Sequence, residues 1–140
     1  MRIEFYGLHF DLPSDWADRT DNVPEGVPTL ALPSGVGAFQ FTIARYAGGK
    51  HPRVSIVALR SMLAEFCRKQ PRAFDDPVTN MGKVFSVGCV SHDLSETLGV
   101  WYLSNGSDVV LATYLGLSFD HPEVASELAE VRQSIATMDF

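Results

Sequence analysis

The chain has only two cysteines, Cys67 and Cys89, among its 140 residues. Two are too few for the disulfide framework of a small secreted protein, and free cysteine is among the most buried residue types. We therefore expect both to be reduced core residues, although their spacing leaves a bridge between them open. No apolar run approaches the roughly 20 residues of a membrane span, and Arg2 and Glu4 interrupt the position of a signal peptide. These absences predict a cytoplasmic protein.

Motifs of common catalytic and metal sites are also missing. The sequence has no Gly-x-Ser-x-Gly elbow and no His-Glu-x-x-His run. Gly48-Gly49-Lys50 lacks the flanking residues of a phosphate-binding loop, and Cys89-x-x-His92 has no second pair to complete a zinc site. A site assembled from His9, Asp11 and His92 leaves an enzyme open as a third reading. We otherwise predict no catalytic residue, no metal and no cofactor.

Positive charge is scarce and unevenly distributed. The chain carries 11 basic and 17 acidic residues, a net charge of −6. This balance argues against nucleic-acid binding, which needs a clustered positive face. Six of the basic residues lie within 48–72, which holds one acidic residue, whereas 73–140 carries ten acidic and two basic residues. The basic block is either a solvated helix face or a docking patch for an acidic partner.

Apolar and polar residues alternate at the start of the chain. The segment 3–12 predicts a strand with a bulge at Gly7. Because proline cannot donate to a ladder, this strand either ends at Pro13 or runs along a sheet edge. Trp16 follows, and we expect its ring to fold back over the core. A turn is expected over Leu94-Ser95-Glu96. Further strands are predicted over 29–32, 38–46, 85–89, 100–103 and 109–117, the last two joined by a two-residue turn at Asn105-Gly106.

Two segments have the apolar spacing of helices. The first lies within 52–70, with Ser55 as N-cap and Pro71 as its end. The second begins at Asp120, with Glu123 three residues on as a variant of the capping box. Their core-facing stripes are Leu59, Met62, Leu63, Phe66 and Cys67 in the first, and Val124, Leu128, Val131, Ile135 and Met138 in the second.

Hairpins rather than β-α-β units separate the two helices. This order predicts a single α+β domain over 1–140, in which an antiparallel β-sheet is sandwiched with two main α-helices. The long loops at 18–28 and 71–82 are expected positions for binding residues.

Aromatic residues give the strongest indication of a binding surface. The strand pair 100–103 and 109–117 is apolar on both faces, which indicates either a central pair covered on both sides or a groove for a protein partner. Eight residues are candidates for partner binding: Tyr46, Trp101, Tyr102, Tyr114, Asp75, Asp76, Glu123 and Glu127.

The opening motif and the order of elements resemble the PsbP-like α/β sandwich. This group includes photosystem PsbP proteins, small bacterial lipoproteins and the effector-associated (Eag) chaperones of type VI secretion. The resemblance rests on Phe10-Asp11-Leu12-Pro13-Ser14-Asp15-Trp16, on Phe39-Gln40-Phe41-Thr42-Ile43-Ala44-Arg45, and on the closing amphipathic helix. It covers nearly the whole chain as topology, but its motifs are structural. It implies no catalytic residues.

The resemblance leaves two protein-binding roles, in a monomer or a homodimer. We predict the first, a bacterial immunity-type protein that binds and neutralises a cognate toxin, which the acidic balance of 73–140 favours. The other is a type VI secretion chaperone that holds apolar effector helices, which the two-faced strand pair favours. No nucleic-acid or membrane partner is expected.

Overall fold

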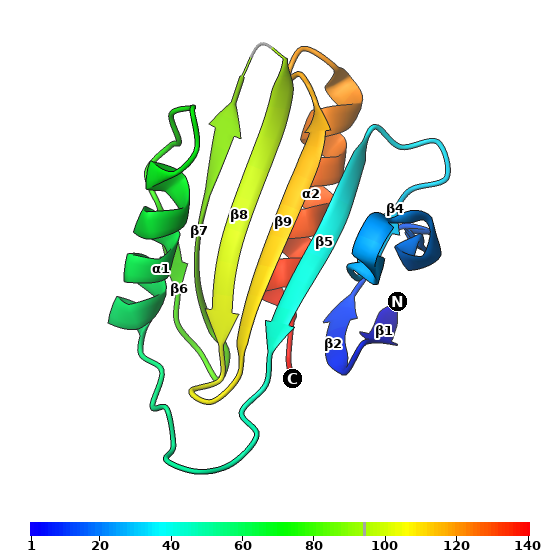
Figure 1. Ribbon diagram of the computed structural model, residues 1–140. Coiled ribbons are helices and arrows are strands. Elements are labelled where there is room, and N and C mark those ends of the chain that lie inside the picture. Colours follow the sequence, from blue (N-terminus) through cyan, green and yellow to red (C-terminus); the bar gives the residue numbers. More distant parts are fainter. Residues whose placement is uncertain (94) are drawn as a thin grey trace.

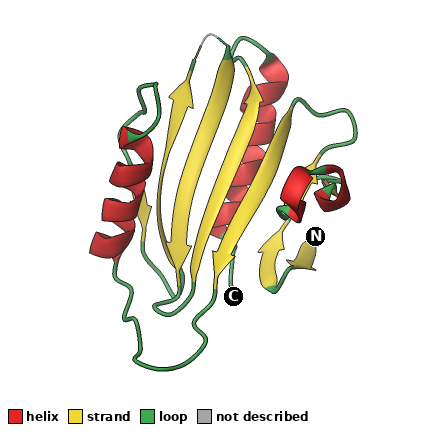
Figure 2. Cartoon of the chain, in the orientation of Figure 1, coloured by secondary structure: helices red, strands yellow, loops and turns green. Residues whose placement is uncertain are grey.

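A computed structural model describes residues 1–93 and 95–140 of the chain. Two helices pack on a seven-stranded antiparallel sheet, and a small hairpin lies beside it, so the α+β prediction is confirmed (Figures 1 and 2). Of the predicted turn at 94–96, Leu94 lies outside the described residues. The strands are β1 Arg2–Phe5, β2 Leu8–Asp11, β3 Ala17–Asp18, β4 Thr29–Ala31, β5 Gly37–Ala44, β6 Val78–Asn80, β7 Phe85–His92, β8 Glu96–Ser104 and β9 Val109–Leu117. The helices are α1 Ile56–Arg68 and α2 Pro122–Ala136, with short 3-10 turns at Thr20–Asn22 and Pro24–Gly26.

The strand order in the large sheet is β3-β4-β5-β9-β8-β7-β6. The hairpin between β8 and β9 is where the sequence predicts it, with Gly106 at φ 99°. The predicted two-residue turn is wrong, however, because Ser104 pairs with Val109 and four residues form the loop. Asn105 stabilises this longer loop, since its side-chain oxygen accepts hydrogen bonds from the backbone N–H groups of Ser107 and Asp108.

The first twelve residues form a hairpin rather than one bulged strand. Phe5 pairs with Leu8, which leaves Tyr6 and Gly7 as a two-residue turn. Their φ angles of 53° and 82° match a type I′ turn, whose twist suits a tight hairpin. The signal at Gly7 therefore marks a turn, not a bulge. Trp16 folds back as expected, with its ring centroid 6.1 Å from that of Phe39.

Both helices form where they are predicted. Ser55 caps α1, because its hydroxyl accepts a hydrogen bond from the Ala58 N–H at 3.2 Å. The predicted start of α2 at Asp120 is wrong by two residues, since the helix begins at Pro122. Pro122 occupies the first turn, which makes His121 the N-cap, and the His121 side chain makes no capping bond.

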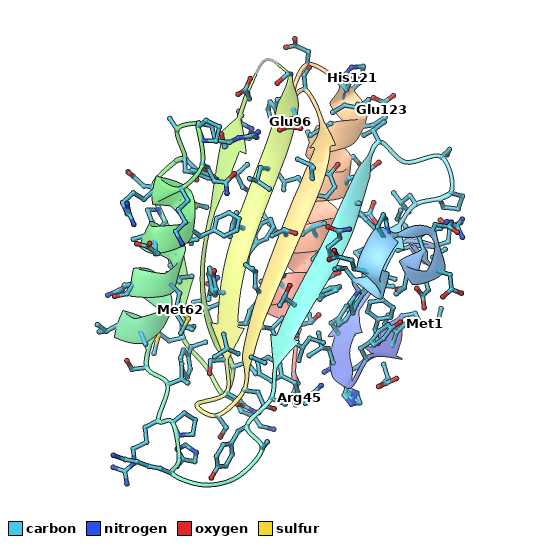
Figure 3. All side chains as sticks on the ribbon, viewed as in Figure 1. Met1, Arg45, Met62, Glu96, His121 and Glu123 are labelled. Carbon is cyan, nitrogen blue, oxygen red and sulfur yellow. The ribbon has the colours of Figure 1, made fainter. Side chains whose placement is uncertain are left out.

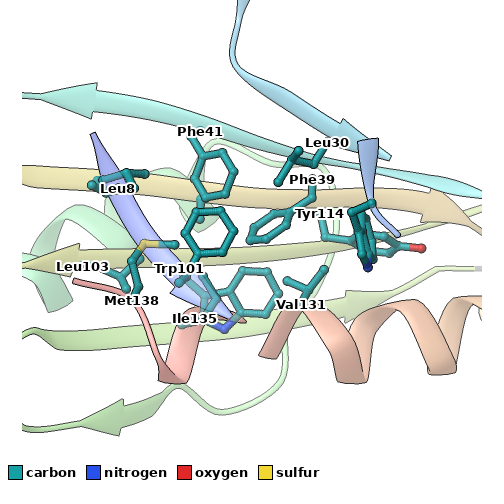
Figure 4. Packing of buried hydrophobic residues seen from close by; sticks show 14 of the residues in the cluster. Leu8, Leu30, Phe39, Phe41, Trp101, Leu103, Tyr114, Val131, Ile135 and Met138 are labelled. Atoms are coloured by element: carbon teal, nitrogen blue, oxygen red, sulfur yellow. The ribbon is translucent and has the colours of Figure 1, made fainter. Parts of the chain in front are cut away.

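The helices cover opposite faces of the sheet. In Figure 1, α2 runs behind the sheet, whereas α1 lies beside β7 and leaves β9 and β5 without a helix in front of them. The larger core lies on the α2 side and includes Phe39, Phe41, Trp101 and Tyr114 (Figure 4). The smaller core lies under α1 and includes Leu59, Leu63, Val87, Cys89, Leu98 and Val100.

Candidate functional site

The side of β5 and β9 that faces away from α2 is only partly covered. Side chains alternate along both strands, so one set packs under α2 and the other points to the opposite face. We call this second set the open face. It consists of Ala38, Gln40, Thr42 and Ala44 of β5 with Val109, Leu111, Thr113, Leu115 and Leu117 of β9.

The open face has no ionisable side chain. Six of its nine members are apolar and the others are Gln40, Thr42 and Thr113. Leu115 and Leu117 are 46% and 45% exposed. An antiparallel sheet normally places polar side chains on its solvated face. A stretch of apolar and uncharged residues on two central strands is therefore unusual, and such patches mark interaction sites.

The surroundings of the open face differ from one side to another. Towards α1, the half-buried rings of Tyr102 and Phe66 pack against the smaller core. Charged groups occur at the two ends of the strands. At one end Arg45 pairs with Asp108 at 3.2 Å, and at the other Glu96 pairs with Arg72. Figure 3 shows Arg45 and Glu96 at these opposite ends. An apolar surface with charged ends resembles the core-and-rim arrangement of protein interfaces.

Two of the predicted aromatic anchors are core residues. Trp101 points to the α2 side, and its ring lies against Gly88 of the neighbouring strand β7 and Gly99 of its own strand, where an added Cβ atom would overlap the ring. Tyr114 is fully buried on the same side, and its hydroxyl donates a hydrogen bond to Glu127 at 2.9 Å. Burial raises the pKa of Tyr114 above its usual value. Neither ring presents a surface to a partner.

The other two predicted aromatics are accessible but lie apart. Tyr102 is half-buried on β8 at the border between α1 and the open face. Tyr46 lies in the loop after β5, where its backbone N–H donates to Asp108 at 2.7 Å and its hydroxyl to the Gly49 carbonyl. Tyr102 therefore borders the open face along β8, whereas Tyr46 lies beyond its end, in the loop after Ala44.

The four predicted acidic residues do not form one surface. Asp75 lies beside the outer strands β6 and β7, where its carboxylate accepts a hydrogen bond from the Val90 N–H, and Asp76 is its exposed neighbour. Glu123 begins α2 on the other face (Figure 3). Glu127 is buried and accepts hydrogen bonds from Tyr114 and from the Val36 N–H. Glu127 is thus a structural residue, because α2 turns it inward onto the sheet.

The dispersed histidines are not brought together. His9 pairs through its backbone with Asp139, whereas His92 is at the far end of β7, with its ring 4.1 Å from that of Phe119. Cys89 packs under α1 while His92 points to the other face of β7, so Cys89-x-x-His92 is not a half-site. In the described ranges 1–93 and 95–140, no group of three His, Cys, Asp or Glu side chains is placed to hold a metal ion.

The sequence allows a groove on one face of the pair 100–103 and 109–117, and the open face does include β9 but extends to β5 rather than to β8. Its signal is present in the sequence, because neither β5 nor β9 contains a charged residue. The absence of charge predicts a strand buried on both sides equally well, and only the position of α1 distinguishes a buried face from an open one.

In the part of the chain that the structure describes, no helix is both long and apolar enough to cross a membrane.

Comparison with known proteins gives no further assignment. No protein-family model and no curated protein matches the chain.

Proposed function

We propose that the chain is a non-catalytic protein-binding module whose open face receives an apolar segment of a partner protein. The observation that supports this proposal is the absence of any ionisable side chain among the nine residues of that face, together with the exposure of Leu115 and Leu117. Covering these two half-exposed leucines contributes about 1 kcal/mol each, or together roughly 30-fold in affinity.

The form of the bound segment follows from the protein's own packing. Helix α1 lies along β7 and β8 on this face of the sheet and packs through Leu59 and Leu63. A second apolar helix, supplied by the partner, would lie next to α1 across β9 and β5. This arrangement favours the role of an effector chaperone that holds apolar helices, as in the PsbP-like Eag chaperones that the sequence resembles.

Toxin neutralisation is the second candidate role, and the net charge of −6 favours it. A basic toxin would be attracted to an acidic immunity protein. Because the exposed predicted carboxylates, Asp75, Asp76 and Glu123, lie on different parts of the surface, the attraction would be spread rather than focused on one site. Both roles belong in the cytoplasm, where unpaired cysteines persist.

The open face can be tested with a defined probe. A fluorescently labelled, alanine- and leucine-rich amphipathic helical peptide is titrated into the protein and binding is followed by anisotropy. The double variant Leu115→Lys/Leu117→Lys places two charges in the patch, and we expect at least a 30-fold loss of affinity. Val57→Lys is the matched control, because Val57 is an exposed apolar residue on α1 outside the open face. Equal affinity of the double variant and the control would overturn the proposal.

The two roles differ in partner and in salt dependence. Affinity capture from the native cell lysate, with mass spectrometry, recovers an effector with apolar helices in the first role and a small basic toxin in the second. Binding to a basic toxin should weaken strongly between low and physiological ionic strength, since exposed charges are screened over about 8 Å at 0.15 M. Binding of an apolar helix should change little.

A further inference from the structure

The two cysteines meet at the boundary between α1 and the sheet. Cys67 lies in the last turn of α1 and Cys89 in the middle of β7, 22 residues further along the chain. Their sulfur atoms are 3.5 Å apart, close enough for a thiol–thiol contact. Both are free cysteines. The fold therefore holds two thiols from different elements in contact, which sequence spacing alone does not predict.

A cavity gives small molecules a route to this pair. It has a volume of about 400 Å³, lies between α1 and the β6–β7 edge of the sheet, and is lined by both cysteines together with apolar residues such as Leu63 and Phe74. Cys67 is half-buried, whereas Cys89 is 4% exposed. Cys67 is consequently the more accessible thiol and Cys89 the one held behind it.

We propose that Cys67 and Cys89 form an oxidation site at which a peroxide converts the two thiols into a disulfide that ties α1 to β7. Peroxide oxidises the Cys67 thiol to a sulfenic acid, with one oxygen transferred to sulfur and one molecule of water released. The Cys89 sulfur then attacks the Cys67 sulfur, the S–O bond breaks, and the hydroxyl leaves as a second water with the Cys89 proton. Two thiols and one peroxide thus give one disulfide and two waters.

The surroundings of Cys89 disfavour its direct oxidation, and its contact with Cys67 at 3.5 Å gives it the second step despite a low thiolate fraction. Burial and the adjacent Cys67 thiol raise the pKa of the Cys89 thiol, so it stays protonated and does not react with oxidants on its own. Its contact with Cys67 means that a sulfenic acid formed there meets a thiol before a second peroxide arrives. This site is independent of the open face and of any partner.

The test uses the full-length reduced protein and hydrogen peroxide. Intact-mass spectrometry should show a loss of about 2 Da, the two hydrogens removed on disulfide formation, reversed by dithiothreitol. Peptide mapping should find Cys67 joined to Cys89 within one chain. A disulfide that joins Cys67 to Cys89, 22 residues further along the chain, should raise the melting temperature by roughly 10 °C. A mass gain of about 16 or 32 Da on separate thiols, or dimers joined between chains, would overturn the proposal.

Two matched variants separate the roles of the cysteines. In Cys89→Ser, Cys67 should be trapped as a sulfenic acid by dimedone, whereas in Cys67→Ser the buried Cys89 should remain unmodified under the same conditions. Circular dichroism checks that each variant is folded, and Cys89→Ala replaces Cys89→Ser if the buried hydroxyl prevents folding. Dimedone labelling of Cys89 in Cys67→Ser, equal to that of Cys67 in Cys89→Ser, would contradict the assigned order.

Discussion

On the α2 side of the sheet, β5 and β9 present Phe39, Phe41 and Tyr114, none of which is more than 1% exposed, whereas on the opposite side β9 presents Leu115 and Leu117, almost half exposed. The same two strands therefore supply both a fully packed core and a partly uncovered, largely apolar surface. The difference arises from the helices, because α2 spans the back of the sheet, while α1 packs on β7 and β8 and its core reaches only Val109 and Leu111 of β9. Whether each face of an apolar strand is buried therefore depends separately on the element that packs against that face.

A leucine-to-alanine substitution on each face of the sheet should show this difference most strongly. Leu103→Ala removes a fully buried side chain from the α2-side core and is expected to destabilise the protein by about 3–5 kcal/mol. Leu115→Ala on the open face is the control and should change stability by less than about 0.5 kcal/mol. Urea-induced unfolding of both variants measures the difference. Similar losses in the two variants would mean that the open face is packed in solution.

A smaller loss is expected under α1. Leu63 is 2% exposed but also lines the cavity beside the cysteines. Leu63→Ala should therefore destabilise the protein by about 2–3 kcal/mol, because a site next to a cavity has fewer packing contacts to lose. The same unfolding measurement applies. A loss larger than that of Leu103→Ala would show that the smaller core contributes more than its size suggests.

The smallest effect concerns one hydroxyl on each face. Tyr114→Phe removes the donor to the buried Glu127 and should destabilise the protein by about 1–2 kcal/mol, the penalty of a buried acceptor without its partner. Tyr102→Phe is its counterpart on the α1 side, where the Tyr102 hydroxyl has no hydrogen-bond partner in the described part of the chain, and it should change stability by less than about 0.5 kcal/mol. Thermal unfolding compares the pair. Equal shifts would remove the structural role assigned to Glu127.

Local patterns in the sequence predict the elements better than their arrangement. The stripe from Val124 to Ile135 and the Ser55 cap depend on neighbours a few residues away, and both are confirmed. The stripe of α1 is only partly confirmed, since Leu59 and Leu63 are buried while Met62 is 37% exposed. Met62 lies at the edge of the helix face, and whether such a residue is buried depends on how far the sheet extends beneath it.

The candidate site could not be predicted because it depends on contacts between distant segments. The chemistry of Tyr114 and Glu127 predicts surface residues, yet the two side chains form a hydrogen bond with each other inside the core. Sequence gives each residue's type but not its face when both faces of a strand are apolar. The contact between Cys67 and Cys89 has the same origin, since it requires the position of α1 on β7.

The packing of the two tryptophans has a consequence for how unfolding is observed. Trp16 and Trp101 are the only tryptophans in the chain, and both lie in the larger core on the α2 side. Tryptophan emission therefore reports the packing of α2 on the sheet and not that of α1, whose core contains no tryptophan. Far-UV circular dichroism records both helices. If α1 detaches first, the dichroism signal will begin to fall while the emission remains native, and the interval between the two transitions will measure the independent stability of the α1 layer.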